Sequence, residues 1–153
     1  MTNLNDITSL MLPRLVEAAA YDAIDPPEVL ARRAGIPEER LVKLDGNENL
    51  YGTSPKVIEA LGRYENYHIY PDPKQRNIRE ALAGYAMTTP DRLIAGVGSD
   101  ELIDLLLRLF VAPGERVIQC VPTFGMYTTF THLVGGELVS VPLNETFDID
   151  VDQ

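Results

Sequence analysis

The sequence RLIAGVGSDELIDLLLRLFVAPGERVIQCV, residues 92–121, decides the fold class of this chain. Its two ends, residues 92–97 and 115–121, have the short apolar pattern of strands. Between them, residues 99–111 form a helix that is apolar on nearly all sides. A second helix over 124–134 and a third strand, ELVSVPL, follow directly. Strands separated by helices of this length predict a parallel α/β sheet.

Upstream of this stretch the pattern is less regular. LVKLD at 41–45 predicts a strand, Ser54 and Pro55 an N-cap and first residue of a helix that ends near Arg63, and 78–86 an amphipathic helix. Residues 1–40 are an expected N-terminal arm, with short helices around 7–20 and after Pro26. We therefore divide the chain into this arm and a domain that spans 41–153.

The composition excludes several classes of protein. The chain has 153 residues, 45% of them hydrophobic, and a formal charge of -10, which argues against nucleic-acid binding through a basic surface. Cys120 is the sole cysteine, so no internal disulfide forms, and this suits the cytoplasm. The first 21 residues lack a signal-peptide pattern, and the apolar stretch 102–112 is too short to span a membrane. His68 and His132 belong to no cluster of metal-ligand spacing.

The glycine turn at 96–98 precedes the apolar helix, where nucleotide-binding loops are often found. The dinucleotide motif needs a third glycine where Glu101 stands, and no Gly-Lys-Ser/Thr follows to make a Walker loop. What remains is a helix N-terminus, whose free N–H groups at Ser99, Asp100 and Glu101 can hold an anion. The alternative is that Ser99 is an ordinary N-cap and that the two acidic residues only favour the helix dipole.

The segment PTFGMY, residues 122–127, follows the next strand at the matching position. Ligands of open α/β sheets bind beyond the carboxyl ends of the strands, so Phe124 is expected beside the anion site. An aromatic ring next to an anion-binding helix end suits a planar, phosphorylated cofactor. The alternative is that Phe124 and Tyr127 are packing residues of the core.

KLDGNENLYGTSP, YPDP, GVGSDELIDLLLRLF and PTFGMY, in this order and spacing, resemble the histidinol-phosphate aminotransferases. The resemblance covers residues 41–153 and continues into the arm. It implies a fold-type-I, three-layer αβα large domain that binds pyridoxal 5'-phosphate. It also implies a cytoplasmic homodimer that exchanges an amino group between L-histidinol phosphate and 2-oxoglutarate, with glutamate as the other amino-acid partner, in histidine biosynthesis.

The same resemblance implies roles for individual residues. Ser99, Asp100 and Glu101 match the turn whose backbone holds the cofactor phosphate, and Phe124 matches the aromatic residue stacked on the pyridine ring. Tyr51 matches a tyrosine that reaches the cofactor phosphate of the neighbouring subunit. Two residues match the loop on the substrate side, Asn47 and Asn49. Leu50 stands where that loop usually has proline, and Tyr21 matches an arm residue near the substrate only loosely.

The sequence departs from the family at the catalytic lysine. Its three lysines, Lys43, Lys56 and Lys74, lie in segments where the family has no lysine that forms a Schiff base. We therefore expect the first part of an aminotransferase, without the rest of the large domain and the small domain, and inactive alone. Two alternatives stay open at this point: a related threonine-phosphate decarboxylase, and an inert module for binding or dimerisation.

Overall fold

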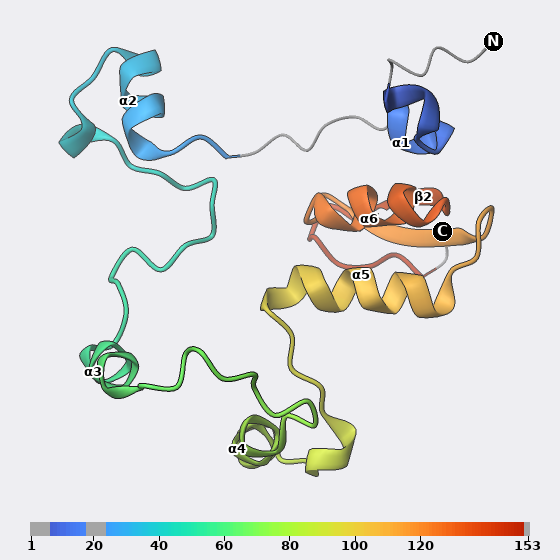
Figure 1. Ribbon diagram of the computed structural model, residues 1–153. Coiled ribbons are helices and arrows are strands. Elements are labelled where there is room, and N and C mark those ends of the chain that lie inside the picture. The colour runs from blue at the N-terminus through green and yellow to red at the C-terminus, as the bar shows by residue number, and fades with distance from the viewer. Residues whose placement is uncertain (1–6, 18–23, 152–153) are drawn as a thin grey trace. The chain divides into compact units, whose positions relative to one another are not determined.

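The computed structural model describes residues 7–17 and 24–151 (Figure 1). Contacts between residues divide the chain into two compact units. One unit contains the described residues of 1–20 and 75–153, and the other contains those of 21–74. We describe each unit by itself, and the division between an arm and a domain at residue 40 stays a prediction.

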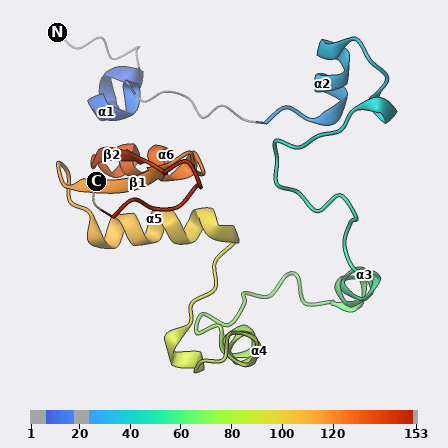
Figure 2. The same ribbon diagram turned by 180° about the vertical axis from the view of Figure 1, so that it is seen from behind.

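The first unit is built around a parallel pair of strands, β1 (Arg116–Val121) and β2 (Glu137–Pro142). Helix α6 (Met126–Val134) connects the two strands, and α5 (Gly98–Phe110) precedes β1 and packs against α6. Figures 1 and 2, drawn from opposite sides, show these four elements gathered in one compact part. The predicted order of helix, strand, helix and strand over 99–143 and the parallel direction of the two strands are therefore confirmed.

Hydrogen bonds between polar side chains connect α6 to the two strands. The Thr128 hydroxyl donates to Gln119 Oε1 at 3.2 Å, and Gln119 Nε2 donates to the Ser140 hydroxyl at 3.1 Å. Helix α6 ends at Gly135, whose φ of 82° is the left-handed value that glycine adopts without strain. After this helix end the chain continues into β2.

Part of the N-terminal arm lies against α6. A 3₁₀ turn, η1 (Ile7–Leu10), and the short helix α1 (Pro13–Val16) replace the longer helix expected over 7–20, whose last residues, like Tyr21, lie outside the described ranges. Arg14 Nε donates to the carbonyl of Leu133 at 3.3 Å. A guanidinium at the C-terminal end of a helix is electrostatically favourable, which explains why the arm contacts α6 there.

The strand predicted over 92–97 is wrong. Arg92 belongs to a 3₁₀ turn, η3 (Pro90–Arg92), and residues 93–97 are not paired with a strand. Instead, the side chain of Gln75, at the start of α4 (Arg76–Ala86), bonds to the backbone of Ala95. An apolar pattern predicts where a strand can form, but a strand also needs the backbone of a neighbour.

The second unit contains α2 (Pro27–Ala34), a 3₁₀ turn η2 (Glu38–Arg40) and α3 (Pro55–Arg63), joined by irregular segments. The helices predicted to begin at Pro27 and Pro55 are confirmed. The strand predicted over 41–45 is wrong, because this segment is unpaired and Val42 and Leu44 are 73% and 86% exposed. Neither of the two segments expected to be strands, 41–45 and 92–97, is paired with a neighbouring strand.

Few side chains of the described residues are buried. Ala31, Ala83 and Thr131 are the buried ones, whereas Leu109, Phe110 and Ile118 are between 70% and 75% exposed. The apolar face that the sequence assigns to the helix over 99–111 is thus largely uncovered. Among the described residues, we find no helix with the length and hydrophobicity to span a membrane.

Candidate cofactor-phosphate site

The first turn of α5 is shaped by two glycines. Gly98 has a φ of 80°, a backbone conformation that other residues adopt only with strain. At Gly96 a Cβ atom would lie 2.9 Å from both Glu101 Oε2 and Leu102 Cγ, so a side chain there would displace Glu101 or Leu102. The glycines therefore let the chain turn tightly and bring Gly96 against the first residues of the helix.

Helix α5 begins one residue earlier than expected. Its N-cap is Val97 and its first residue is Gly98, so the interpretation of Ser99 as N-cap is wrong. The cap comes instead from Glu101, whose carboxylate accepts a hydrogen bond from the Val97 N–H. This bond resembles one half of a capping box, in which a glutamate reaches back to the N-cap N–H.

The N–H groups of Gly98, Ser99 and Asp100 remain free for a ligand. Among the described residues, none of the bonds to backbone groups or side chains involves these three donors. Ser99 is exposed to solvent, and the positive end of the helix dipole lies at these groups. Three adjacent donors at a helix N-terminus are the arrangement that binds a phosphate.

The two carboxylates of this turn do not both face the free donors. That of Glu101 is bound to Val97 N–H. Asp100 is half-buried, and its Oδ1 is shielded from solvent without a hydrogen-bond partner in the described part of the chain. A buried oxygen without a partner is costly, so this oxygen is an unsatisfied acceptor next to the free donors.

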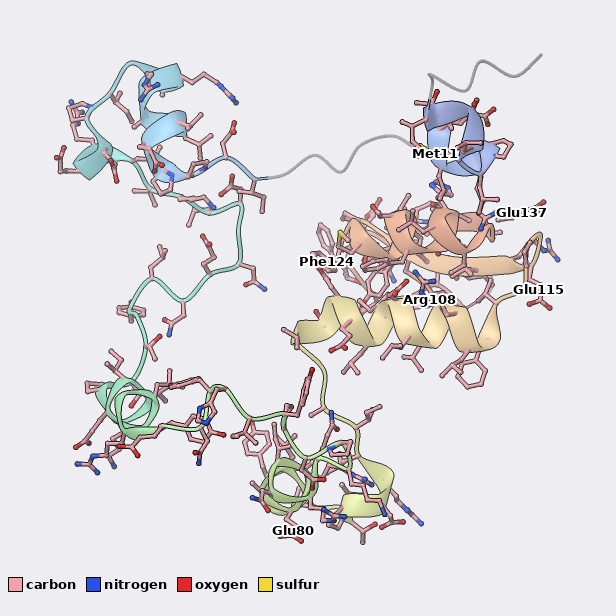
Figure 3. The ribbon with its side chains drawn as sticks, viewed as in Figure 1. Met11, Glu80, Arg108, Glu115, Phe124 and Glu137 are labelled. Carbon is pink, nitrogen blue, oxygen red and sulfur yellow. The ribbon has the colours of Figure 1, made fainter. Side chains whose placement is uncertain are left out.

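Phe124 precedes Gly125, the N-cap of α6. Its ring is 47% exposed and packs edge to face against Tyr127, with 6.1 Å between the ring centroids and 89° between their planes. Figure 3 shows the labelled Phe124 at the end of this unit where α5 begins. The structure thus brings Phe124 to the same end of one unit as Ser99, Asp100 and Glu101.

The other predicted site residues belong to the second unit, in a loop closed by a lysine. Lys43 Nζ lies 3.1 Å from Asp45 Oδ1 and 3.1 Å from Glu48 Oε2. A Cβ at Gly46 would meet Lys43 Nζ at 2.7 Å, so a side chain there would require the Lys43 ammonium to shift. Asn47 follows with a φ of 46°.

Asn49 holds the turn that presents Tyr51. Its Oδ1 accepts from the Tyr51 N–H at 3.2 Å, and its Nδ2 donates to the carbonyl of Gly52 at 2.9 Å. The Tyr51 side chain is fully exposed. Asn49 therefore has a structural role in this loop, and its predicted contact with substrate stays a prediction.

The protonation of Lys43 can be checked directly. Hydrogen bonds first to Asp45 and then to Glu48 raise the pKa of Lys43 above 10.5. Because the folded pKa is raised, the stabilisation is complete below pH 10.5 and is lost as the pH rises through the folded value. We expect ¹³C NMR of the lysine Cε to give a Lys43 midpoint above 10.5 that falls in the Asp45→Asn variant. An unchanged midpoint would show that the ion pairs do not form.

The histidines and the cysteine form no metal or catalytic cluster in the described part of the chain. His68 and His132 are exposed, and Cys120 is a half-buried free thiol that lines an apolar groove of about 380 Å³ between α5, β1 and α6. In the described ranges we find no group of three His, Cys, Asp or Glu side chains that can hold a metal ion.

A family model matches most of the chain. Residues 39–153 match the model described as "Aminotransferase class I and II". The chain belongs to this aminotransferase family. Its members use pyridoxal phosphate, whose phosphate and ring are the groups that a helix N-terminus and an aromatic face accommodate.

Curated relatives of this aminotransferase chain carry a more specific name. It is 46% identical over 151 residues to the histidinol-phosphate aminotransferase of Roseiflexus castenholzii, which covers 95% of this chain and 41% of the relative. It is 43% identical to the chloroplastic histidinol-phosphate aminotransferase 1 of Arabidopsis thaliana, with 95% and 35% covered. The chain thus spans about two-fifths or less of the length of these relatives and matches their N-terminal portion.

Solved structures agree on the fold. Histidinol-phosphate aminotransferase from Sinorhizobium meliloti, solved in complex with pyridoxal-5'-phosphate, superposes with a TM-score of 0.69 at 26% identity, over 88% of this chain and 35% of that one. An aspartate aminotransferase from Thermotoga maritima has the same TM-score at 18% identity, over 93% and 40%, and supports the fold alone. The expected fold-type-I αβα class is therefore confirmed, and the two-stranded sheet is a part of it.

Two features of this aminotransferase chain escaped the sequence analysis. Gln75 bonds to Ala95, although nothing in the sequence links two residues twenty positions apart. Tyr70, in the YPDP segment, is 98% exposed, about as much as Tyr51. The tyrosine at the start of YPDP is the sequence feature that could have pointed to this second exposed ring.

Proposed function

We propose that this chain is the cofactor-phosphate-binding part of a histidinol-phosphate aminotransferase. The complete protein would transfer an amino group between L-histidinol phosphate and 2-oxoglutarate in histidine biosynthesis. The observation that carries this proposal is 46% identity over 95% of the chain to a histidinol-phosphate aminotransferase, together with three free N–H groups at the start of α5.

The residues of the first turn of α5 fit a phosphate. Gly98, Ser99 and Asp100 would each donate a backbone N–H, and the helix dipole would favour the negative charge. The Glu101 carboxylate is held by the Val97 N–H, so it does not compete for these donors. This carboxylate would position the turn, while the backbone N–H groups of Asp100 and Glu101 both stay predicted phosphate contacts.

Bound in this way, pyridoxal phosphate would supply an electron sink for the carbon that exchanges its amino group. The residues of this chain would then bind the cofactor and orient it. Phe124, half-exposed at the same end of the unit, would contact a face of the pyridine ring. Asn47 and Asn49 would shape the substrate side of the site, and Tyr51 would reach the cofactor phosphate of a partner subunit in a cytoplasmic homodimer.

We propose that none of the three lysines of this chain is the catalytic amine. An amine that attacks a carbonyl has to be unprotonated, whereas ion pairs with Asp45 and Glu48 raise the pKa of Lys43. Lys56 and Lys74 are exposed. The resemblance puts both in segments where the family has no lysine that forms a Schiff base. The chain alone is therefore proposed to bind the cofactor without catalysing transamination.

The assignment of Tyr51 is tested by exchanging single hydroxyl groups. If Tyr51 contacts a partner's cofactor phosphate, Tyr51→Phe is expected to weaken pyridoxal phosphate binding about fivefold, the effect of one lost hydrogen bond. Tyr70→Phe is the matched control, since both rings are exposed. Equilibrium dialysis measures both dissociation constants. A loss confined to Tyr70→Phe would transfer the role to Tyr70 and contradict the assignment.

The phosphate dependence of binding tests the proposal itself. The chain is expected to bind pyridoxal phosphate at least about tenfold more tightly than pyridoxal, because only the former carries the group held by α5. Inorganic phosphate should compete with it. Equal affinity for the two compounds would contradict a phosphate site.

A further inference from the structure

Gln75 and Ala95 exchange two hydrogen bonds. Gln75 Nε2 donates to the carbonyl of Ala95 at 2.6 Å, and the Ala95 N–H donates to Gln75 Oε1 at 3.0 Å. Both residues are half-buried. A pair of opposite bonds to one backbone residue is what a neighbouring antiparallel strand provides. The side-chain amide of Gln75 thus takes the place of a strand for a segment that has none.

The backbone of Gln75 is unusual for a residue with a side chain. It is the N-cap of α4, with a left-handed φ of 54° and ψ of 33°. Its carbonyl still accepts from the Arg79 N–H at 2.9 Å, so α4 begins normally. A non-glycine residue adopts this conformation only at an energetic cost that its surroundings offset. The two bonds to Ala95 provide such an offset.

The bonded residue lies where it can control the phosphate site. Ala95 directly precedes Gly96, where a Cβ atom would displace Glu101 or Leu102, and Gly98, the first residue of α5, follows after Val97. Glu101 holds the far end of this turn through the Val97 N–H, and Gln75 holds the near end. No other hydrogen bond to the Ala95 backbone is present in the described part of the chain.

We infer that Gln75 is a positioning residue, which fixes the turn before α5 and so directs the free N–H groups of Gly98, Ser99 and Asp100 at the cofactor phosphate. This inference rests on the proposed function for the identity of the ligand. Gln75 touches neither cofactor nor substrate, and it acts through Ala95.

The experiment uses ¹⁵N-labelled chain and two substitutions of Gln75. Gln75→Gly removes the amide and also relieves the left-handed backbone, so any loss of order comes from the missing side chain. Gln75→Glu keeps the shape but turns a carboxylate oxygen towards the Ala95 carbonyl, and protonation at low pH restores a donor there. Arg79→Gln is the matched control, because it removes the 2.6 Å bond from Arg79 Nε to the Pro90 carbonyl, from the same helix.

Two readouts separate the local role from the effect on binding. In Gln75→Gly, the Ala95 amide is expected to exchange with solvent about tenfold faster, and pyridoxal phosphate, followed at the Ser99 and Asp100 amides, to bind about tenfold more weakly. Binding of pyridoxal, which has no phosphate, should not change. Arg79→Gln should leave both readouts unchanged, and in Gln75→Glu both should recover as the pH falls.

Faster Ala95 exchange with unchanged pyridoxal phosphate binding would overturn the inference, as would no change in either readout. If Gln75→Gly does not fold, the pH-dependent recovery of Gln75→Glu decides, and its absence contradicts the role. If the Ser99 and Asp100 amide signals of the unsubstituted chain do not change on addition of pyridoxal phosphate, the proposed function itself is contradicted. This result is different from a failure that is confined to the variants.

Discussion

Replacing Gly96 by alanine is expected to abolish most of the affinity for pyridoxal phosphate. The new Cβ would lie 2.9 Å from Leu102 Cγ and from Glu101 Oε2, inside the closest distance that real atoms allow. Forcing a methyl group into such a contact costs about 1–3 kcal/mol, and here it displaces the carboxylate that caps Val97. We expect binding to weaken at least about thirtyfold, measured by equilibrium dialysis.

Two other glycines serve as controls for this substitution. Gly84 lies in α4 with nothing within 4 Å of an added Cβ, so Gly84→Ala is expected to stabilise the chain by about 0.5–1 kcal/mol and leave binding unchanged. Gly98→Ala meets no atom but strains a φ of 80°, and should weaken binding about tenfold. If Gly96→Ala binds like Gly84→Ala, the tight turn does not matter for the phosphate.

No lysine of the chain is expected to form a specific adduct with pyridoxal phosphate. After incubation and reduction with borohydride, intact mass and peptide mapping should show modification of Lys43, Lys56 and Lys74 only at the level of a denatured control. Lys43 is held protonated by two carboxylates, which raise its pKa, and a protonated amine does not attack an aldehyde. A stoichiometric adduct on one lysine would show that this chain has its own catalytic amine.

A related expectation concerns activity. The chain supplied with pyridoxal phosphate, L-histidinol phosphate and 2-oxoglutarate is expected to form no glutamate above the rate of the free cofactor, for the same reason. Glutamate formation that depends on the chain would contradict our assignment of the lysine to other residues.

Local chemistry explains which parts of the fold could be predicted from the sequence. Helix starts at Pro27 and Pro55, and the strands at 116–121 and 137–142, depend on proline geometry and on apolar runs that the sequence shows directly. The strands expected over 41–45 and 92–97 failed because pairing requires a neighbour, and a one-dimensional pattern contains no information on where a neighbour lies.

At the candidate site, too, local features were predictable from the sequence and tertiary contacts were not. An anion site at the start of α5 is predicted from a glycine turn before a helix, and it stays a prediction. The cap was assigned to Ser99, the commonest residue type at that position, whereas Glu101 provides it. Only the close approach at Gly96 shows why a glutamate four residues later can reach Val97. The contact of Gln75 with Ala95 depends on tertiary structure and had no signal in the sequence.

The central claim is that the start of α5 holds the phosphate of pyridoxal phosphate, and backbone amide shifts test it most directly. In ¹⁵N-labelled chain titrated with pyridoxal phosphate, the account predicts saturable shifts centred on Gly98, Ser99 and Asp100, weaker shifts at the same amides with inorganic phosphate, and none there with pyridoxal. Shifts confined to other residues, or random-coil positions for these three amides throughout the titration, would contradict it.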